Sequence, residues 1–219
     1  MGATTATSNT EVTRILLVRH GTTSWNEERR YQGHQDPELN PRGREQARRL
    51  GAFLAGNGLA ALGVGDIHAV YSSDLRRARA TAELVGDSLG SIPVQLSSNL
   101  REMNFGRWEG LTSGEISRLF PDEWKAWLET PLQARPGSGE SLVELQERML
   151  AALRDIAATH AGEAVLVVSH GGAIKAAICG ILHLDLRERF RFSLDNCSVS
   201  VLTFRQGKEP RLDLLNLAV

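Results

Sequence analysis

The sequence contains little cysteine, no long apolar run and almost no net charge, and each of these absences excludes a class of protein. Two cysteines in 219 residues do not make a secreted disulfide scaffold. A formal net charge of −1 provides no general attraction to nucleic acid or to an anionic membrane. The apolar runs are too short to cross a bilayer, and no cluster of residues has metal-ligand spacing. We therefore expect no metal, no cofactor, no nucleic acid and no membrane among the partners.

What remains is the composition of an ordinary globular protein, with 42% hydrophobic and 23% charged residues. A chain of this length can bury one sizeable core, so we predict a single domain over residues 14–219. Residues 1–13 are rich in Thr, Ala and Ser and lack the regions of a signal peptide. We predict a tail there and a cytoplasmic location. Cys179 and Cys197 lie in apolar surroundings and are predicted to be buried free thiols.

Short apolar runs alternate along the chain with longer patterns of helical period. The predicted strands are residues 15–18, 67–71, 93–96, 164–168, 199–204 and 212–217. The predicted helices follow Asn40, begin at Leu75, follow Ser141 and follow Gly172, and Ser141 forms a capping box with Glu144. This alternation predicts a three-layer α/β/α sandwich with a mostly parallel central sheet.

One segment departs from this pattern. Residues 104–139 hold three of the four tryptophans, at positions 108, 124 and 127, together with three prolines. We predict an irregular helical cap inserted into the domain. The tryptophans either pack inside this cap or stack on an aromatic or sugar group of a substrate.

Reactive side chains follow the predicted strands. Arg19-His20-Gly21 and Ser169-His170-Gly171 each come directly after an apolar strand, Arg77 lies just beyond the second strand, and Glu102 lies beyond the third. In a parallel sheet the carboxyl ends of strands meet at one edge, where ligands bind. Glycine after a strand permits a tight turn and close backbone approach, and arginine offers a planar fork for phosphate oxygens. The pattern favours a phosphate site.

The order of these motifs resembles the histidine phosphatase superfamily, in its phosphoglycerate mutase-like branch. The resemblance is carried by Leu17-Val-Arg-His-Gly-Thr-Thr-Ser-Trp-Asn26, Arg30-Tyr-Gln-Gly33, Ser72-Ser-Asp-Leu-Arg-Arg-Ala78, Leu100-Arg-Glu-Met-Asn-Phe-Gly-Arg-Trp-Glu-Gly110, Gly139-Glu-Ser-Leu142 and Val167-Val-Ser-His-Gly-Gly172. It implies a phosphoglycerate mutase-like fold and an enzyme that needs no metal.

The resemblance also implies roles for individual residues. His20 is expected to attack phosphorus and to become phosphohistidine, with its other ring nitrogen donating to a backbone acceptor. Arg19 and Arg77 are expected to bind the non-bridging oxygens, and His170 to add a donor or positive charge. Glu102 is the expected general acid and base.

Further residues resemble family positions near the phosphate. Asn26 is expected to help hold the phosphoryl group. A looser set is predicted at the substrate entrance or beside it: Thr23, Gln32, Gly33, Glu140 and Asn196. Of these, Thr23 is better explained by bracing the loop that carries it.

Three functions agree with the sequence. The first is hydrolysis of a small phosphomonoester, the second is phosphoryl transfer of the phosphoglycerate mutase type, and the third is binding without catalysis. From Glu102 to His170 is 170 − 102 = 68 positions, which is similar to the shorter phosphatase form. Segments of the chain are similar to α-ribazole phosphatases, metal-independent phosphoserine phosphatases and broad-specificity sugar or glycerate phosphate phosphatases. The expected partner is a small phosphomonoester, and assembly as a homodimer stays open.

Overall fold

The computed structural model describes residues 11–219, and a six-stranded sheet lies at its centre in the order β3-β2-β4-β1-β5-β6. The pairings β3–β2, β2–β4 and β4–β1 are parallel, whereas β1–β5 and β5–β6 are antiparallel. The strands are β1 (Val12–Arg19), β2 (Ile67–Ser73), β3 (Val94–Ser97), β4 (Ala164–Ser169), β5 (Val199–Arg205) and β6 (Arg211–Leu217).

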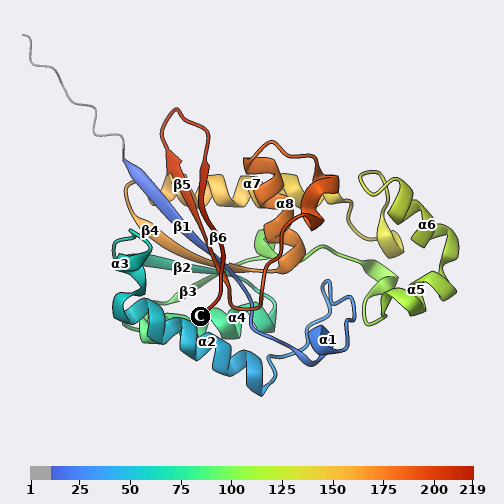
Figure 1. Ribbon diagram of the computed structural model, residues 1–219, viewed down its shortest axis with the longest axis horizontal. Helices are drawn as coiled ribbons and strands as arrows, with labels where there is room; N and C mark the ends of the chain where they lie inside the picture. The colour runs from blue at the N-terminus through green and yellow to red at the C-terminus, as the bar shows by residue number, and fades with distance from the viewer. Residues whose placement is uncertain (1–10) are drawn as a thin grey trace, which may run out of the picture.

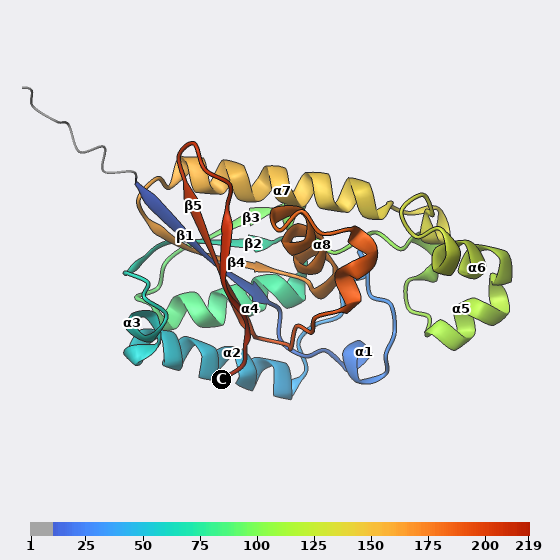
Figure 2. The same ribbon diagram turned by 45° about the horizontal axis from the view of Figure 1, so that its top comes forward.

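Two pairs of helices cover the two faces of this sheet (Figures 1 and 2). Helices α2 (Pro41–Phe53) and α4 (Arg76–Ser88) lie on one face, and α7 (Leu142–Thr159) and α8 (Gly171–Ile181) lie on the other. Strand β1 shows why, because Leu16 and Val18 belong to the core under α2 and α4 while Ile15 and Leu17 belong to the core under α7 and α8. A strand buried on both sides needs a helical layer on each. The predicted three-layer sandwich is confirmed.

The remaining elements are short. They are α1 (Ser24–Glu27), α3 (Leu59–Ala61), α5 (Ser113–Leu119), α6 (Pro121–Glu129), a π-helical continuation of α2 at Leu54–Gly58, and 3-10 turns at Ser98–Leu100, Gly106–Trp108, Pro136–Ser138 and Leu186–Phe190.

Two predicted helix starts have the side-chain caps that the sequence indicates. The Asn40 side chain accepts a hydrogen bond from the backbone N–H of Gly43 at 2.8 Å, and Pro41 occupies the first turn of α2. At the start of α7, Ser141 and Glu144 form a reciprocal capping box. These caps satisfy N–H groups that the helix itself leaves without partners.

The sheet begins earlier than predicted. Val12 and Thr13 already pair with β5, and the Thr13 hydroxyl donates to the His160 carbonyl at 3.0 Å. The predicted tail over residues 1–13 is therefore too long at its carboxyl end. Its first ten residues lie outside the described part of the chain.

The segment predicted as a cap, residues 104–139, contains α5 and α6 and extends from one end of the sandwich (Figure 1). The carboxyl ends of β1 and β4 point towards this end of the molecule, beside α1. Trp108 is fully buried in the extension, with its ring centroid 5.7 Å from that of Trp124 and 6.3 Å from that of Trp127. The three predicted tryptophans therefore pack against one another.

Candidate active site

Two histidines meet at the carboxyl edge of the sheet because their strands are neighbours. His20 follows β1 and His170 follows β4, and these strands pair in register up to Arg19 and Ser169. The backbone N–H of His20 then donates to the Ser169 carbonyl at 2.9 Å. The two imidazole centroids lie 5.1 Å apart. Residues 150 positions apart in sequence are thus brought together by one parallel pairing.

The His20 ring is held in one tautomer. Its Nδ1 lies 2.7 Å from the Gly21 carbonyl oxygen, which can only accept, so Nδ1 carries the proton and donates. Nε2 is then left with a lone pair. The side chain is 3% exposed, and burial, with the charges of Arg77 and Arg19, lowers the pKa of His20 well below its ordinary value. The predicted backbone acceptor for His20 is present, and the lowered pKa favours the neutral ring.

This neutrality can be measured. A histidine whose pKa is lowered stays unprotonated until the pH falls below that lowered value. We expect the ring ¹⁵N shifts of His20 to report a neutral Nδ1–H imidazole in the unliganded protein from about pH 8 to about pH 6. The His20→Ala variant assigns the signals. A titration of His20 centred near the value of a free histidine would contradict the burial argument.

Arg19 and Arg77 are buried guanidinium groups anchored by backbone carbonyls. Arg19 donates to the Leu194 carbonyl at 2.6 Å, and Arg77 donates to the carbonyls of Gln35 at 2.7 Å and Gly33 at 2.8 Å. The Nε atom of each has no hydrogen-bond partner within residues 11–219. Burial lowers the pKa of Arg77 to about 10, partly offset by Glu102, so the group is charged at neutral pH. Each arginine therefore holds a fixed charge with an N–H still to be satisfied.

Arg77 and its neighbour Arg76 lie in different environments. Arg77 is fully buried, whereas the Arg76 side chain is 63% exposed and pairs with Glu38.

His170 is fully buried, and neither ring nitrogen has a hydrogen-bond partner in the described part of the chain. Burial, followed by the charges of Arg77 and His20, lowers the pKa of His170 well below its ordinary value. A buried polar group without a partner costs free energy, so a ligand that accepts from this ring removes that cost. The lowered pKa favours the neutral His170 imidazole, which can still donate one hydrogen bond.

Glu102 lies at the N-terminus of α8. Its carboxylate accepts from the backbone N–H groups of Gly172, Ala173 and Met103, each at 2.9 Å. A Cβ on Gly172 would come within 2.6 Å of Glu102 Oε1. Glycine is therefore needed at position 172 to leave room for the Glu102 side chain, and not to form a turn. The helix N-terminus favours the negative charge that Glu102 brings.

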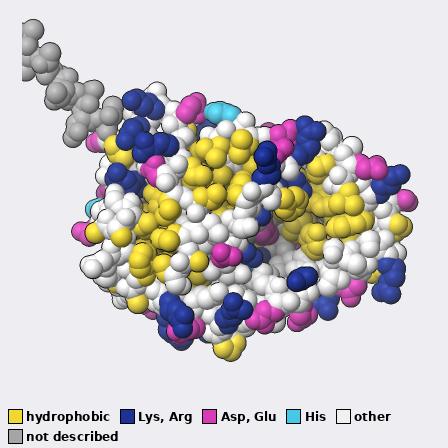
Figure 3. All heavy atoms as spheres, viewed as in Figure 1, with side chains coloured by type: hydrophobic (Ala, Val, Ile, Leu, Met, Phe, Trp, Pro, Cys, Tyr) yellow, Lys and Arg dark blue, Asp and Glu magenta, His cyan; other side chains and the backbone are white. Residues whose placement is uncertain are grey.

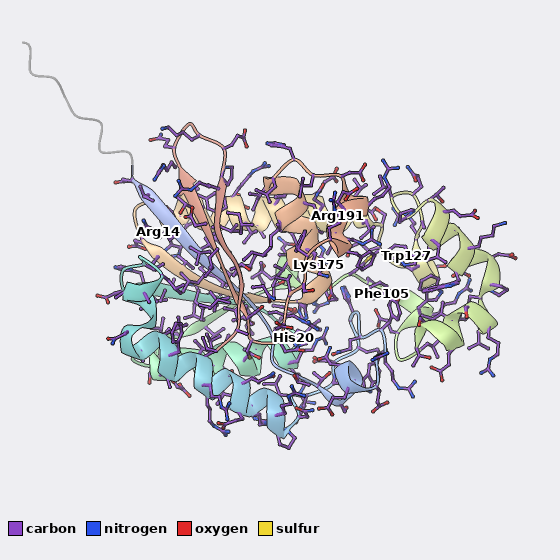
Figure 4. All side chains as sticks on the ribbon, in the orientation of Figure 1. Arg14, His20, Phe105, Trp127, Lys175 and Arg191 are labelled. Carbon is purple, nitrogen blue, oxygen red and sulfur yellow. The ribbon has the colours of Figure 1, made fainter. Side chains whose placement is uncertain are left out.

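Arg19, His20, Arg77 and Glu102 line a pocket of about 260 Å³, whereas His170 lies behind His20 and is not among the lining residues. The lining residues are Arg19, His20, Trp25, Asn26, Arg29, Arg30, Tyr31, Gln32, Arg77, Glu102, Phe105 and Gly171. Figure 3 shows the hollow on this face, and Figure 4 shows His20 and Phe105 on two sides of it. The Gln32 Oε1 atom is buried without a partner among the described residues. The predicted positions of Asn26 and Gln32 at the pocket agree with this lining.

Two other predicted entrance residues support the pocket without lining it. Thr23 is fully buried and caps α1, where its hydroxyl accepts from the Asn26 backbone N–H at 3.2 Å. Gly33 has a φ of +51° and offers its carbonyl to Arg77. A Cβ on Gly33 would collide with the Glu109 carboxylate. Thr23 thus braces its own loop, and a place for Gly33 at the pocket entrance stays a prediction.

Glu140 and Asn196 also lie behind the pocket. Glu140 pairs with Arg148 at 2.7 Å, and Arg148 in turn donates to the carbonyls of Arg101 and Glu102. Asn196 donates to the His20 carbonyl at 2.9 Å. Neither side chain lines the pocket. Both residues hold the loops that carry Glu102 and His20, so both lie close to the site, and contact of either side chain with a substrate stays a prediction.

Sequence reasoning missed several contributors. Glu109 accepts from the backbone N–H groups of His34, Gln35 and Phe105, and so ties together two loops of the pocket. Trp25, Tyr31 and Phe105 form the aromatic wall. Trp108, Trp124 and Trp127 do not line this pocket. The signal for Glu109 was its place in the motif Leu100–Gly110, but two of its three N–H donors, His34 and Gln35, belong to another segment of the chain.

Within residues 11–219, no three side chains of His, Cys, Asp or Glu are grouped in a way that would hold a metal ion. In the same part of the chain, no helix combines the length and apolar character needed to cross a membrane. Cys179 and Cys197 are buried and free, as predicted.

An imidazole with a free lone pair, two anchored guanidinium groups and a carboxylate around one small pocket make a site suited to phosphoryl transfer. The profile of the histidine phosphatase superfamily (branch 1) matches residues 15–218. The chain belongs to this family, and it is a phosphoric monoester hydrolase by class. The predicted family and enzyme class are confirmed.

The relatives include both phosphatases and mutase-like proteins. The chain is 42% identical over 163 residues to phosphoglycerate mutase-like protein 4 of Arabidopsis thaliana, covering 74% of this chain and 68% of the relative. It is 31% identical over 201 residues to phosphoserine phosphatase 1 of Hydrogenobacter thermophilus, covering 92% and 91%. A phosphoserine phosphatase mutant from Entamoeba histolytica, solved with phosphoserine, superposes with a TM-score of 0.80 at 30% identity, covering 93% of this chain and 96% of that one.

Proposed function

We propose that this protein hydrolyses a small phosphomonoester through a phosphohistidine intermediate on His20, without a metal. The observation that carries the proposal is the hydrogen bond from His20 Nδ1 to the Gly21 carbonyl, in a pocket that also holds Arg19 and Arg77. That bond leaves Nε2 as the one ring nitrogen able to attack. Phosphoserine phosphatases among the relatives support hydrolysis as the net reaction.

In the first step, His20 Nε2 attacks phosphorus as the bond from phosphorus to the leaving oxygen breaks. Arg19 and Arg77 hold the non-bridging oxygens, and His170 donates to the same group. Glu102 protonates the leaving oxygen. Glu102 acts in this step as the acid, and it becomes a carboxylate once the proton has left.

In the second step, a water molecule attacks the phosphohistidine and the nitrogen–phosphorus bond breaks. Glu102, now a carboxylate, takes the proton from that water. His20 returns to its neutral state with the Nδ1 proton still donated to Gly21, and inorganic phosphate leaves. Dividing one difficult transfer into two steps is the advantage of a covalent intermediate.

A mutase reaction is the second candidate, favoured by the likeness to phosphoglycerate mutase-like protein 4. It shares the first step, but the phosphoryl group returns to a retained substrate and not to water. The pocket of about 260 Å³ accepts a small substrate in either case. Binding without catalysis is the third candidate and predicts no phosphate release.

One assay separates these three functions. We expect the purified protein to release inorganic phosphate from at least one member of a panel of phosphoserine, α-ribazole phosphate, sugar phosphates and phosphoglycerates. The same rate should be found with and without a strong chelator, because the cations at the pocket are side chains. Isomerisation of 3-phosphoglycerate is followed in parallel. Isomerisation faster than phosphate release would establish the mutase, and activity lost to the chelator and restored by a metal would refute the metal-free step.

A further inference from the structure

The backbone at Gly21 determines which nitrogen of His20 can attack, because the Gly21 carbonyl is the acceptor that holds the Nδ1 proton. Glycine is required at this position, since a Cβ there would lie 2.5 Å from the Gly43 carbonyl oxygen in the first turn of α2. Glycine is also the residue whose backbone is least restricted by its own side chain. The direction of the Gly21 carbonyl must therefore be fixed by other groups.

The peptide between Gly21 and Thr22 is held from α2. Its N–H group, on Thr22, donates to Gln46 Oε1 at 3.0 Å, and the Thr22 hydroxyl donates to the same oxygen at 2.8 Å. Its carbonyl, on Gly21, is the one that accepts from the His20 ring. Gln46 and His20 thus bind the two ends of a single peptide unit. The hydrogen bond to its N–H group also polarises the peptide and makes its carbonyl a stronger acceptor.

The preceding peptide, between His20 and Gly21, is held from α4. Its N–H group donates to Thr81 Oγ1 at 3.0 Å, and its carbonyl accepts from the Asn196 side chain at 2.9 Å. Thr81 is fully buried, and its hydroxyl donates to the Arg77 carbonyl at 2.7 Å. That donation leaves the lone pairs of Thr81 Oγ1 to accept from Gly21. One hydroxyl therefore joins the helix that carries Arg77 to the loop that carries His20.

Thr81 and Gln46 reach this loop from behind the catalytic pocket, and neither lines it. Helices α2 and α4 pack side by side on one face of the sheet (Figures 1 and 2). Figure 4 shows His20 beyond the end of β1, close to these two helices. Any effect of Thr81 or Gln46 on the reaction must then act through the backbone that they hold.

We propose that Thr81 and Gln46 are positioning residues for the nucleophile, which fix the His20 tautomer through the two peptides that flank Gly21. This proposal rests on the proposed function, since it takes His20 as the attacking group. Without these contacts the Gly21 carbonyl is free to turn away, and the His20 ring is free to carry its proton on Nε2. That tautomer has no lone pair on Nε2 with which to attack phosphorus.

The first measurement is the tautomer itself, which needs no substrate. We expect the ring ¹⁵N shifts of His20 to report the Nδ1–H form in the wild type and in Thr81→Ser, which keeps the hydroxyl. Thr81→Val replaces the hydroxyl with a methyl group of similar size, and Gln46→Met removes the acceptor on α2. Both of these variants should populate the Nε2–H form, because each frees one of the two peptides.

Two control variants remove polar groups from the same helices without touching the loop. Ser88→Ala deletes a hydroxyl of α4 that donates to the Leu84 carbonyl at 3.3 Å, the same contact within the helix that Thr81 makes. Arg49→Met deletes a polar group of α2 that pairs with Glu45. Both controls should keep the Nδ1–H form and the rate of the wild type.

The second measurement is the rate at which phosphohistidine forms. For Thr81→Val and Gln46→Met we expect this rate to fall roughly tenfold, equally for p-nitrophenyl phosphate and an alkyl phosphate, because both need the same nucleophile. KM should stay within about twofold of the wild-type value, since the groups that bind phosphate are unaltered. The trapped label should still reach the wild-type amount, whereas a partly unfolded protein would trap less.

The proposal is overturned if Thr81→Val and Gln46→Met keep the Nδ1–H form, if Thr81→Ser loses it as well, or if the rate falls only in proportion to the trapped label. Should Thr81→Val fail to fold, Gln46→Met decides alone, because Gln46 is only half-buried. A change of tautomer that Thr81→Ser avoids, in a protein that hydrolyses no phosphomonoester, would support the positioning role and contradict the proposed function.

Discussion

Replacing His20 with alanine should abolish turnover while the protein remains folded. We expect a loss on the order of 10⁴-fold or more in kcat, because the nucleophile of both steps disappears. The side chain donates to the carbonyl of its neighbour Gly21 and makes no other described hydrogen bond through its ring, so its removal breaks no link between elements. The measurement is phosphate release together with circular dichroism.

The intermediate gives a second measurement of the same claim. Rapid acid-free quenching of the wild type with a ³²P-labelled substrate should trap label that is stable to base and labile to acid, as phosphohistidine is. The label should be absent in His20→Ala and present in His68→Ala, which alters an exposed histidine on β2. His20 would be ruled out as the nucleophile if His20→Ala retained substantial turnover, or if it trapped as much label as the wild type.

The layers of the fold could be predicted because they depend on local patterns. β1 and β4 have apolar centres, at residues 15–18 and 164–168, and strands of that kind require helices on both faces. The capped starts at Asn40 and Ser141 are local too, since each cap joins residues three positions apart. The start of β1 at Val12 was not predictable in this way. Val12 and Thr13 enter the sheet through contacts with β5, more than 190 positions later.

The site residues also fall into those that local sequence predicts and those that depend on distant contacts. Arg19, His20 and His170 were accessible from sequence because each lies at or just after the end of a strand, and parallel strands place such residues at one edge. Glu140 and Asn196 carry an equally clear motif, yet their side chains face Arg148 and the His20 carbonyl. A motif places a residue near a site, but its partner decides whether it touches the ligand. That partner is distant in sequence for both residues.

The aromatic wall was beyond sequence reasoning for a related reason. The sequence shows a cluster of tryptophans at positions 108, 124 and 127, and in the structure Trp108 packs against the other two. Trp25 and Phe105, which line the pocket, come from segments 80 positions apart. Only the docking of the extension against α1 brings them together.

Replacing Glu102 with glutamine should slow the first step only for substrates with a poor leaving group, and should slow the second step for all substrates. We expect the first turnover of an alkyl phosphate to fall roughly 10²–10⁴-fold, because alkoxide leaves poorly without a proton. Nitrophenolate leaves without one, so the first turnover of p-nitrophenyl phosphate should be nearly unchanged. Hydrolysis of the phosphohistidine formed from p-nitrophenyl phosphate should slow, because Glu102→Gln has no carboxylate to activate water. Stopped-flow should show a burst of nitrophenol equal to the enzyme concentration, followed by slow release, and no burst of alcohol.

The Glu102→Gln substitution also disturbs the hydrogen bonds around this side chain. Glu102 Oε1 accepts from Met103 and Ala173 and Oε2 accepts from Gly172, so a glutamine amide group must face one of these N–H donors. A loss caused by such displacement would affect both substrates alike, whereas loss of proton transfer affects them unequally. Glu140→Gln, which weakens the pairing with Arg148 that supports the same loop, provides the matched control. A uniform loss in that variant beside a leaving-group-dependent loss in Glu102→Gln would assign the proton to Glu102, and uniform losses in both would remove it from the chemistry.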